Sequence, residues 1–214
     1  MSGPGKGKES QGFNFVALQL CVFMVIVFAL QMFIEIEPGF NASSSEWWKF
    51  FTSIFGHSDM NHLFNNLFFL GLFGSIYERW TSGQILVYTF LVSALFANLT
   101  AFIFFPDSFI IGASGGAMGV LAALAVYRPN SIGLGLGVPL PMWAVLIIYL
   151  FTNLAGLTGS TNIAYEAHLF GIVSGAIFGL WLRDPSSEEI TKEQRLEEDN
   201  WRKKVREWEE KYMM

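Results

Sequence analysis

The sequence predicts an all-α, polytopic membrane protein built as a bundle of six transmembrane helices. Of its 214 residues, 52% are hydrophobic and only 14% are charged, whereas a water-soluble domain carries about 25% charged residues to cover its surface. The charges also cluster, because residues 183–214 hold 8 of the 13 Lys and Arg and 10 of the 18 Asp and Glu. The rest of the chain divides into apolar runs suited to crossing ~30 Å of hydrocarbon.

The first apolar run, residues 13–34, contains no charged residue and is too long for the hydrophobic region of a cleaved signal peptide. We therefore expect it to be retained as the first span. Five further spans are predicted at about 60–77, 84–105, 114–127, 141–158 and 164–182. The run at 114–127 is short and rich in Gly and Ala. This composition favours a central helix, since small residues let neighbouring helices approach closely.

Three regions follow from this pattern: an N-terminal tail at 1–12, the six-span membrane domain at 13–182 and a polar tail at 183–214. In the second tail, apolar residues recur at helical spacing, which predicts an amphipathic helix. The short loops decide the orientation, because Lys and Arg collect on the cytoplasmic side. Five basic residues fall on one side and one, Lys49, on the other. Both termini are therefore expected in the cytoplasm, and the cell membrane is the expected location.

Some functions are disfavoured by composition alone. No basic stripe is present to neutralise phosphates, so nucleic acid is not an expected partner. The single cysteine, Cys21, excludes an intrachain disulfide and a cysteine-based zinc site. Residues 35–59 form a long outer connection, and loops of this length in compact domains are usually functional or disordered. Its aromatic segment, 47–51, is typical of the membrane interface.

Ionisable groups inside membrane spans are costly, so they are functional candidates by default. All three histidines lie in or beside predicted spans: His57 just before the second, His62 in its first turns and His168 in the first turns of the sixth. Asn66 follows His62 by four residues, so both project from one helical face. This pair predicts a polar interior or cavity. The alternative is a hydrogen bond that only joins helices.

A serine stands where an outer loop enters the short fourth span, in the string Gly112-Ala113-Ser114-Gly115. Free backbone N–H groups and the positive end of the dipole at a helix N-terminus favour a developing oxyanion. The flanking glycines would let a substrate backbone approach. The alternative is a glycine motif for helix packing with an incidental serine.

Glycines on two spans predict how the serine meets a base. Gly171 and Gly175 line one face of the sixth span, and Gly115 and Gly119 line a face of the fourth. If these faces pack together, His168, one turn before Gly171, comes close to Ser114. A hydroxyl within reach of an imidazole is the arrangement of an activated nucleophile. Since Asp107 lies in the preceding loop and Glu166 projects from another face, we expect a dyad whose imidazole is oriented by packing.

At this point the residues resemble a known family, the rhomboid proteases, which are six-span serine proteases opening to the non-cytoplasmic side. The resemblance covers about 45–182. Its motifs are the loop from Trp47 to His57, then His62 and Asn66 in an HxxxN helix, Glu78 and Gly83 at a cytoplasmic turn, GASGGAMG for GxSGxxxG, and AHLFGIVSG for AHxxGxxxG.

The resemblance implies a role for each matching residue. Ser114 would be the nucleophile and His168 the general base and acid. Asn66 and His62 would donate to the oxyanion together with the Ser114 backbone N–H, and His57 would be an accessory polar residue near a water-filled mouth. This chain departs from the family pattern in having Lys49 for Arg, Met118 for an aromatic residue under the histidine, and Glu166 for Gly.

The expected function is therefore an intramembrane serine endopeptidase that cleaves transmembrane segments of membrane proteins in the lipid bilayer through an acyl-enzyme. No metal or organic cofactor is expected. Two alternatives remain at this stage. One is a catalytically silent rhomboid-like module that binds membrane proteins. The other is a small transporter or channel whose His and Asn residues bind a solute.

Overall fold

The computed structural model describes residues 14–34, 37–41, 46–106, 109–158, 164–183, 200 and 203. The chain divides into two units, Met1–Leu180 and Trp181–Met214, and nearly all of the described residues belong to the first. The predicted amphipathic tail helix lies largely outside the described residues, as does Asp107.

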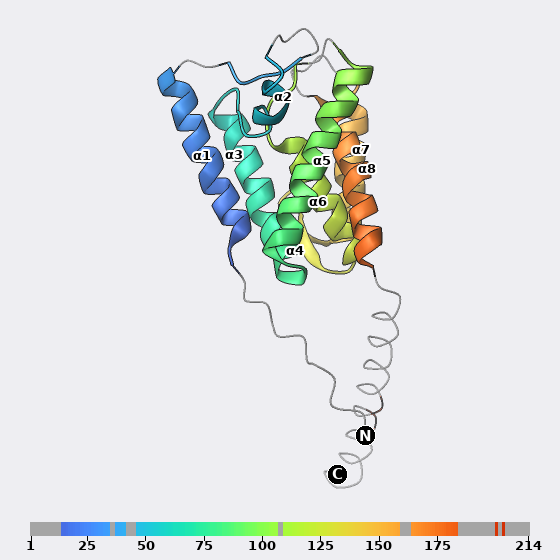
Figure 1. Cartoon of the computed structure of the whole chain (residues 1–214). Coiled ribbons are helices and arrows are strands. Elements are labelled where there is room, and N and C mark those ends of the chain that lie inside the picture. Colours follow the sequence, from blue (N-terminus) through green and yellow to red (C-terminus); the bar gives the residue numbers. More distant parts are fainter. Residues whose placement is uncertain are drawn as a thin grey trace, which may run out of the picture. The chain divides into compact units, whose positions relative to one another are not determined.

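The described part of the chain is mostly helical, which confirms a helical membrane bundle (Figure 1). Helices occur in each of the six predicted regions. Their bounds are α1 Val16–Ile34, α3 Met60–Phe69 continuing through the π-helix η1 Leu70–Gly74 into α4 Ser75–Trp80, α5 Gly83–Phe104, α6 Ser114–Tyr127, α7 Met142–Gly156 and α8 Tyr165–Leu182. By length and composition, α1, α5 and α8 are able to cross a membrane. The count of six spans stays a prediction.

Polar residues fix where the helices begin. Asp59 precedes α3, and its side chain accepts a hydrogen bond from the backbone N–H of His62 at 2.9 Å. Ser82 does the same for α5 by accepting from Ile85 N–H at 3.2 Å. Such caps satisfy one of the donors that a helix N-terminus leaves free. The cap at Asp59 places the first turns of α3, and with them His62 and Asn66.

The helix α6 occupies the centre of the bundle in Figure 1. Every residue from Gly115 to Ala125 is buried, and α6 begins deeper in the bundle than the upper ends of α1 and α5. On one side α5 packs closely, since a Cβ built on Gly116 would lie 2.7 Å from the Phe90 ring. The Gly- and Ala-rich composition of α6 thus suits a helix surrounded by others.

The backbones of α6 and α8 touch along a row of glycines. A Cβ built on Gly171 would overlap the carbonyl oxygen of Gly115, and one on Gly175 would overlap the carbonyl oxygen of Gly119. One turn further along, a Cβ on Gly179 would lie 2.7 Å from the Ala123 carbonyl oxygen. We call this contact the glycine seam. It holds the first turn of α8 against the first turn of α6.

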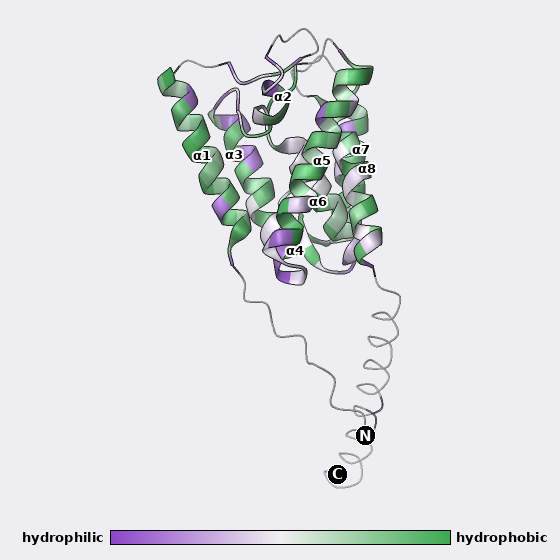
Figure 2. Cartoon of the chain, viewed as in Figure 1, coloured by the Kyte–Doolittle hydropathy of each residue, from purple (hydrophilic) through white to green (hydrophobic). Residues whose placement is uncertain are grey.

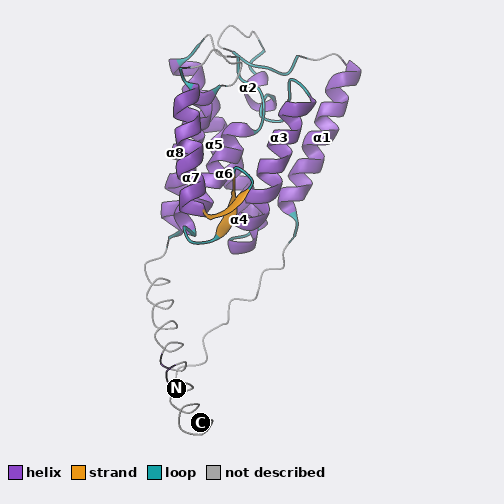
Figure 3. Ribbon diagram, turned by 180° about the vertical axis from the view of Figure 1, so that it is seen from behind, coloured by secondary structure: helices purple, strands orange, loops and turns teal. Residues whose placement is uncertain are grey.

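A small β-hairpin between α6 and α7 was not predicted. Its strands, β1 Ile132–Gly135 and β2 Val138–Pro141, pair antiparallel with Gly135 opposite Val138 (Figure 3). The two turn residues, Leu136 and Gly137, have φ of 52° and 81°, as a two-residue hairpin turn with both central residues at positive φ requires. Leu rarely adopts this conformation, which is why the residue types at the turn do not predict a hairpin.

The long loop before α3 contains local structure within its described residues. It contains the short helix α2, Lys49–Thr52, and Phe40 forms an antiparallel bridge with Ile110. The Asn98 side chain of α5 donates to the Phe50 carbonyl at 2.8 Å and to Ser53 Oγ at 3.2 Å. These bonds tie the loop to the bundle beside the start of α6.

The surface of α1 is apolar over most of its length, as its colouring in Figure 2 shows. Large side chains such as Val22, Ile26 and Phe33 are exposed, Phe33 to 85%. Exposed apolar side chains on this scale are unfavourable in water. They suit contact with lipid and agree with an integral membrane protein.

Candidate active site

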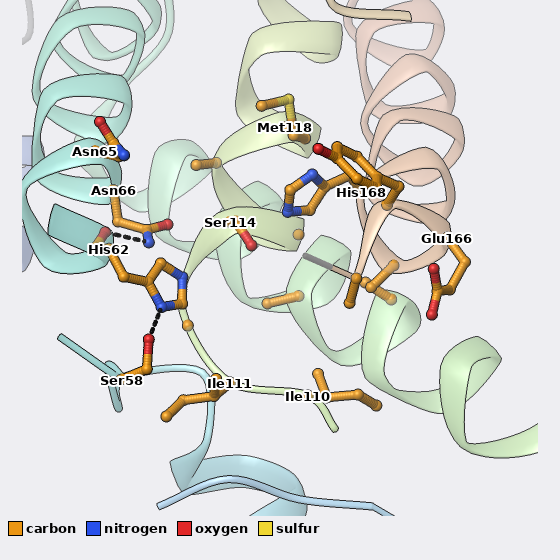
Figure 4. A pocket seen from close by; sticks show the side chains of 18 of the residues that line it. Ser58, His62, Asn65, Asn66, Ile110, Ile111, Ser114, Met118, Glu166 and His168 are labelled. Carbon is orange, nitrogen blue, oxygen red and sulfur yellow. Dashed lines mark hydrogen bonds between the residues drawn. The ribbon is translucent and has the colours of Figure 1, made fainter. Parts of the chain in front are cut away.

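One cavity is lined by residues of five helices, α3, α5, α6, α7 and α8, and of the loops that connect them. Its lining includes Ser114 of α6, His168 of α8, and both His62 and Asn66 of α3. Its volume is about 1210 Å³, which exceeds the usual size of a small-molecule site and leaves room for a length of polypeptide. In Figure 4 the His168 ring lies beside Ser114 with one ring nitrogen toward it, and no hydrogen bond joins the two side chains. The structure thus brings together four of the five polar residues predicted for the site.

The turn into α6 depends on Gly112. Its φ is +107°, a conformation that residues with a side chain rarely adopt, and a Cβ there would lie 2.6 Å from His62 Nε2. The Gly112 N–H donates to the Ser53 carbonyl at 2.8 Å, so the loop is fixed just before Ser114. Ala113 precedes the helix, and no side chain caps it. The first backbone N–H groups of α6 are therefore free of side-chain acceptors at the cavity.

On the opposite wall, His62 and Asn66 are held by local hydrogen bonds, drawn in Figure 4. Ser58 Oγ lies 3.1 Å from His62 Nδ1, and Asn66 Nδ2 donates to the His62 carbonyl at 2.9 Å. An amide nitrogen has two hydrogens, so Asn66 keeps one for another acceptor. The backbone N–H of His62, and then the Ser58 hydroxyl, hold the pKa of the Asp59 carboxyl below its usual value.

The His168 ring is positioned by a residue that sequence reasoning missed. Its Nδ1 lies 2.7 Å from Oδ1 of Asn153 on α7. Asn153 is only 4% exposed, and its Nδ2 donates to the Tyr149 carbonyl at 2.7 Å. We expected the ring to be oriented by packing alone. The signal was available, because Asn153 is a polar residue near one end of a predicted span, as are the histidines that the sequence analysis selected.

The remaining predicted residue, His57, is not among the residues that line the cavity. It is 2% exposed, and its ring centroid lies 5.2 Å from that of His62. Its backbone N–H and carbonyl both bond to the Gln31 side chain, at 3.1 and 3.0 Å, and neither ring nitrogen has a hydrogen-bond partner. Burial, followed by the nearby His62, lowers the pKa of His57 to about 4. Its accessory role stays a prediction.

Glu166 lies on the cavity wall, and in Figure 4 its carboxylate points away from the His168 ring. Among the described residues, no group of three or more His, Cys, Asp or Glu side chains is arranged to hold a metal ion.

Fold and site together define a class: a helical membrane protein with a serine, a histidine and amide donors around a cavity at the N-terminus of its central helix. A family model, described as the Rhomboid domain, matches residues 44–185. The chain belongs to the rhomboid family, as the sequence motifs predicted.

Curated relatives agree with this assignment. The chain is 28% identical over 149 residues to rhomboid protease GlpG of Yersinia enterocolitica, covering 67% of this chain and 51% of the relative. It is 27% identical over 177 residues to rhomboid protease GluP of Bacillus subtilis, covering 79% and 34%. Rhomboid-like protein 11, chloroplastic, of Arabidopsis thaliana is 36% identical over 77 residues, covering 36% and 28%. The matches thus span about half or less of each relative.

Proposed function

We propose that this protein is an intramembrane serine endopeptidase that cuts transmembrane segments of other membrane proteins. One observation carries the proposal: Ser114 and His168 face the same cavity from two helices joined by the glycine seam. A rhomboid-family chain that had become a silent binding module would have no need to keep both groups, since either loss alone removes the activated nucleophile.

In the proposed reaction His168 takes the proton of the Ser114 hydroxyl as the serine oxygen attacks a peptide carbonyl carbon. The carbonyl oxygen becomes an oxyanion, and Asn66 Nδ2, His62 and the Ser114 backbone N–H donate to it. The tetrahedral intermediate then collapses. The peptide C–N bond breaks, the proton on His168 passes to the amine, and an ester to Ser114 remains. Water hydrolyses the ester by the same steps, with His168 again as base.

The substrate in this proposal is a protein with a single membrane-spanning helix that unwinds near its outer end. The Gly-rich surroundings of Ser114 favour small side chains before the cut. Following the distribution of Lys and Arg, the proposal places both termini in the cytoplasm, the cavity on the non-cytoplasmic side, and the protein in the cell membrane. The reaction requires no metal or cofactor.

The direct test uses the purified full chain in detergent with a single-span reporter protein and a fluorophosphonate probe. Wild type is expected to cleave the reporter and to be labelled, and Ser114→Ala to do neither. The matched control is Ser131→Ala, because the Ser131 hydroxyl donates to the Arg128 carbonyl away from the cavity. An intact reporter and no labelling of wild type above Ser114→Ala would instead support the silent binding module.

A further inference from the structure

We propose that Asn153 is the positioning residue of this site, completing a Ser114–His168–Asn153 triad by holding His168 in the tautomer that can act as a base. The inference rests on the proposed function, because it concerns how the same site works. The residue spacing alone predicts only a Ser114–His168 dyad.

The direction of the hydrogen bond follows from the neighbouring contact. Oxygen and nitrogen of an asparagine amide are assigned from their hydrogen bonds. One end of the Asn153 amide lies 2.7 Å from the Tyr149 carbonyl oxygen, and only an NH2 group can donate to that acceptor. The other end, 2.7 Å from His168 Nδ1, is therefore the oxygen. Since an amide oxygen only accepts, His168 Nδ1 must carry the hydrogen.

This assignment decides what the imidazole can do. A neutral ring carries one hydrogen, and here it is on Nδ1, so Nε2 presents a lone pair. Since Asn153 occupies the Nδ1 side, Nε2 is the nitrogen left for the cavity, which Ser114 also lines. With the other tautomer, Nε2–H would face the hydroxyl and could not take its proton.

Other neighbours of the His168 ring do not select its tautomer. Met118 stands in α6 where the family pattern has an aromatic residue, and it packs with Ala122 and Ile172. The Tyr165 ring meets His168 edge-on, with centroids 6.1 Å apart, which restricts the ring without selecting a tautomer. Among the contacts of the described residues, the Asn153 bond is the one that distinguishes the two ring nitrogens.

A purely structural role is the competing explanation, since a hydrogen bond between α7 and α8 would also join two helices. The two roles predict different kinetics. A helix-joining bond changes stability and leaves the chemistry of folded molecules alone. A tautomer-holding bond changes kcat with little change in KM, because it acts in the proton transfer and not in substrate binding.

The experiment compares wild type with Asn153→Ala and Asn153→Asp in reporter cleavage. Asn153→Ala is expected to lower kcat by about tenfold to a hundredfold with KM within about twofold. Asn153→Asp can accept the same bond while adding a negative charge, which favours the protonated ring. Its activity is expected to be retained at high pH, with the acidic limb of the pH–rate profile moved to higher pH by about one unit.

The matched control is Thr152→Ala. The Thr152 hydroxyl donates to the same Tyr149 carbonyl at 3.0 Å, from an exposed position on the same helix, so its loss disturbs α7 without touching His168. It is expected to leave kcat and the pH profile unchanged. Wild-type kcat in Asn153→Ala, or an unshifted acidic limb in Asn153→Asp, overturns the inference. If Asn153→Ala does not fold, the Asn153→Asp profile still decides.

A second readout separates this inference from the proposed function. In ¹⁵N-histidine-labelled protein, the signals lost in His168→Ala assign His168, and wild type is expected to show the Nδ1–H tautomer. Asn153→Ala is expected to lose that preference. An inactive wild type with an Nδ1–H ring rejects the protease and keeps the positioning contact. An active wild type whose His168 carries its hydrogen on Nε2 rejects the positioning contact alone.

Discussion

The N-termini of α1 and α6 differ in what meets their free backbone N–H groups. At α1, the Glu78 carboxylate of α4 accepts hydrogen bonds from the backbone N–H groups of Val16, at 3.0 Å, and Ala17, at 3.1 Å. Glu78 is only 4% exposed, so a charged group of the protein itself fills the helix terminus. At α6, no side chain caps the helix, and its first residue, Ser114, faces a cavity.

The comparison shows that a buried ionisable residue in a membrane bundle is not by itself a sign of catalysis. Both termini carry free N–H donors and the positive end of a helix dipole. At α1 these donors are satisfied internally, and the result is a structural joint between α1 and α4. At α6 no side chain occupies the donors, so they remain available to the oxyanion of the proposed reaction. What distinguishes a structural terminus from a candidate site is whether a side chain of the protein already accepts hydrogen bonds from the backbone N–H groups.

The largest predicted effect on activity comes from removing the Ser114 hydroxyl at the N-terminus of α6. Ser114→Ala removes the nucleophile, and reporter cleavage is expected to fall by on the order of 10⁴-fold or more. The change deletes one hydroxyl at the cavity wall, so the free energy of unfolding is expected to stay within about 0.5 kcal/mol of wild type. Activity and denaturation in detergent measure the two quantities. Residual cleavage near the wild-type rate would contradict the α6 half of the comparison.

A smaller effect on activity, with a loss of stability, is expected from a substitution in the glycine seam between α6 and α8. Gly171→Ala would drive a methyl group into the Gly115 carbonyl, separating α6 from α8. We expect a loss of about 1–3 kcal/mol of stability together with a fall in kcat.

Gly71→Ala is the matched control, because its Cβ would meet only Cys21 Sγ at 3.7 Å, an ordinary contact. Thermal unfolding and reporter cleavage of both variants test the prediction. Equal behaviour of the two variants would show that the seam does not set the site's geometry.

Loss of the Glu78 hydrogen bonds to α1 is expected to lower stability and to leave kcat unchanged, the reverse of Ser114→Ala. Glu78→Gln removes the charge and leaves one oxygen to accept from two N–H groups. The expected loss of stability is about 1–3 kcal/mol, with kcat of the folded fraction unchanged. Unfolding and kcat normalised to probe labelling measure the two effects. A fall in kcat without destabilisation would mean that the two termini are not independent.

The smallest effect is a pH dependence of stability from His57. Its pKa in the fold is about 4, against about 6.5 for an unperturbed histidine. Between these values the unfolded chain binds the proton and the folded chain does not, so stability is fully present above about pH 6.5 and falls as the pH drops toward 4.

His57→Phe is expected to reduce this slope in unfolding titrations across that window. Asp59 does not account for the slope, because its lowered pKa places its titration below the window. A slope that persists unchanged in His57→Phe would assign the dependence to other groups.

The sequence predicted most reliably those features that depend on a single helix. The composition of 114–127 predicted a buried central helix, and residue spacing placed His62 with Asn66 on one face of α3. The glycines on two spans also suggested which faces meet. Each inference needed only helical periodicity and the size of a glycine.

Asn153 shows where that reasoning stops. Its spacing says which face of α7 it occupies, yet the sequence does not say that this face turns toward α8 and not toward lipid. The hairpin was missed for a different reason, because Leu136 adopts a positive φ that its own preferences disfavour. Interactions with the neighbouring strands and helices outweigh the local preference there.

The glycine seam has a mechanical consequence. Where backbone meets backbone, no rotamer change can widen the gap, so the spacing between α6 and α8 is set by the least deformable atoms of the chain. The N-terminal parts of α6 and α8 therefore move together as one rigid unit, which carries Ser114 on α6 and His168 on α8. An opening that would admit the proposed polypeptide substrate therefore has to come from helices or loops outside this α6–α8 contact.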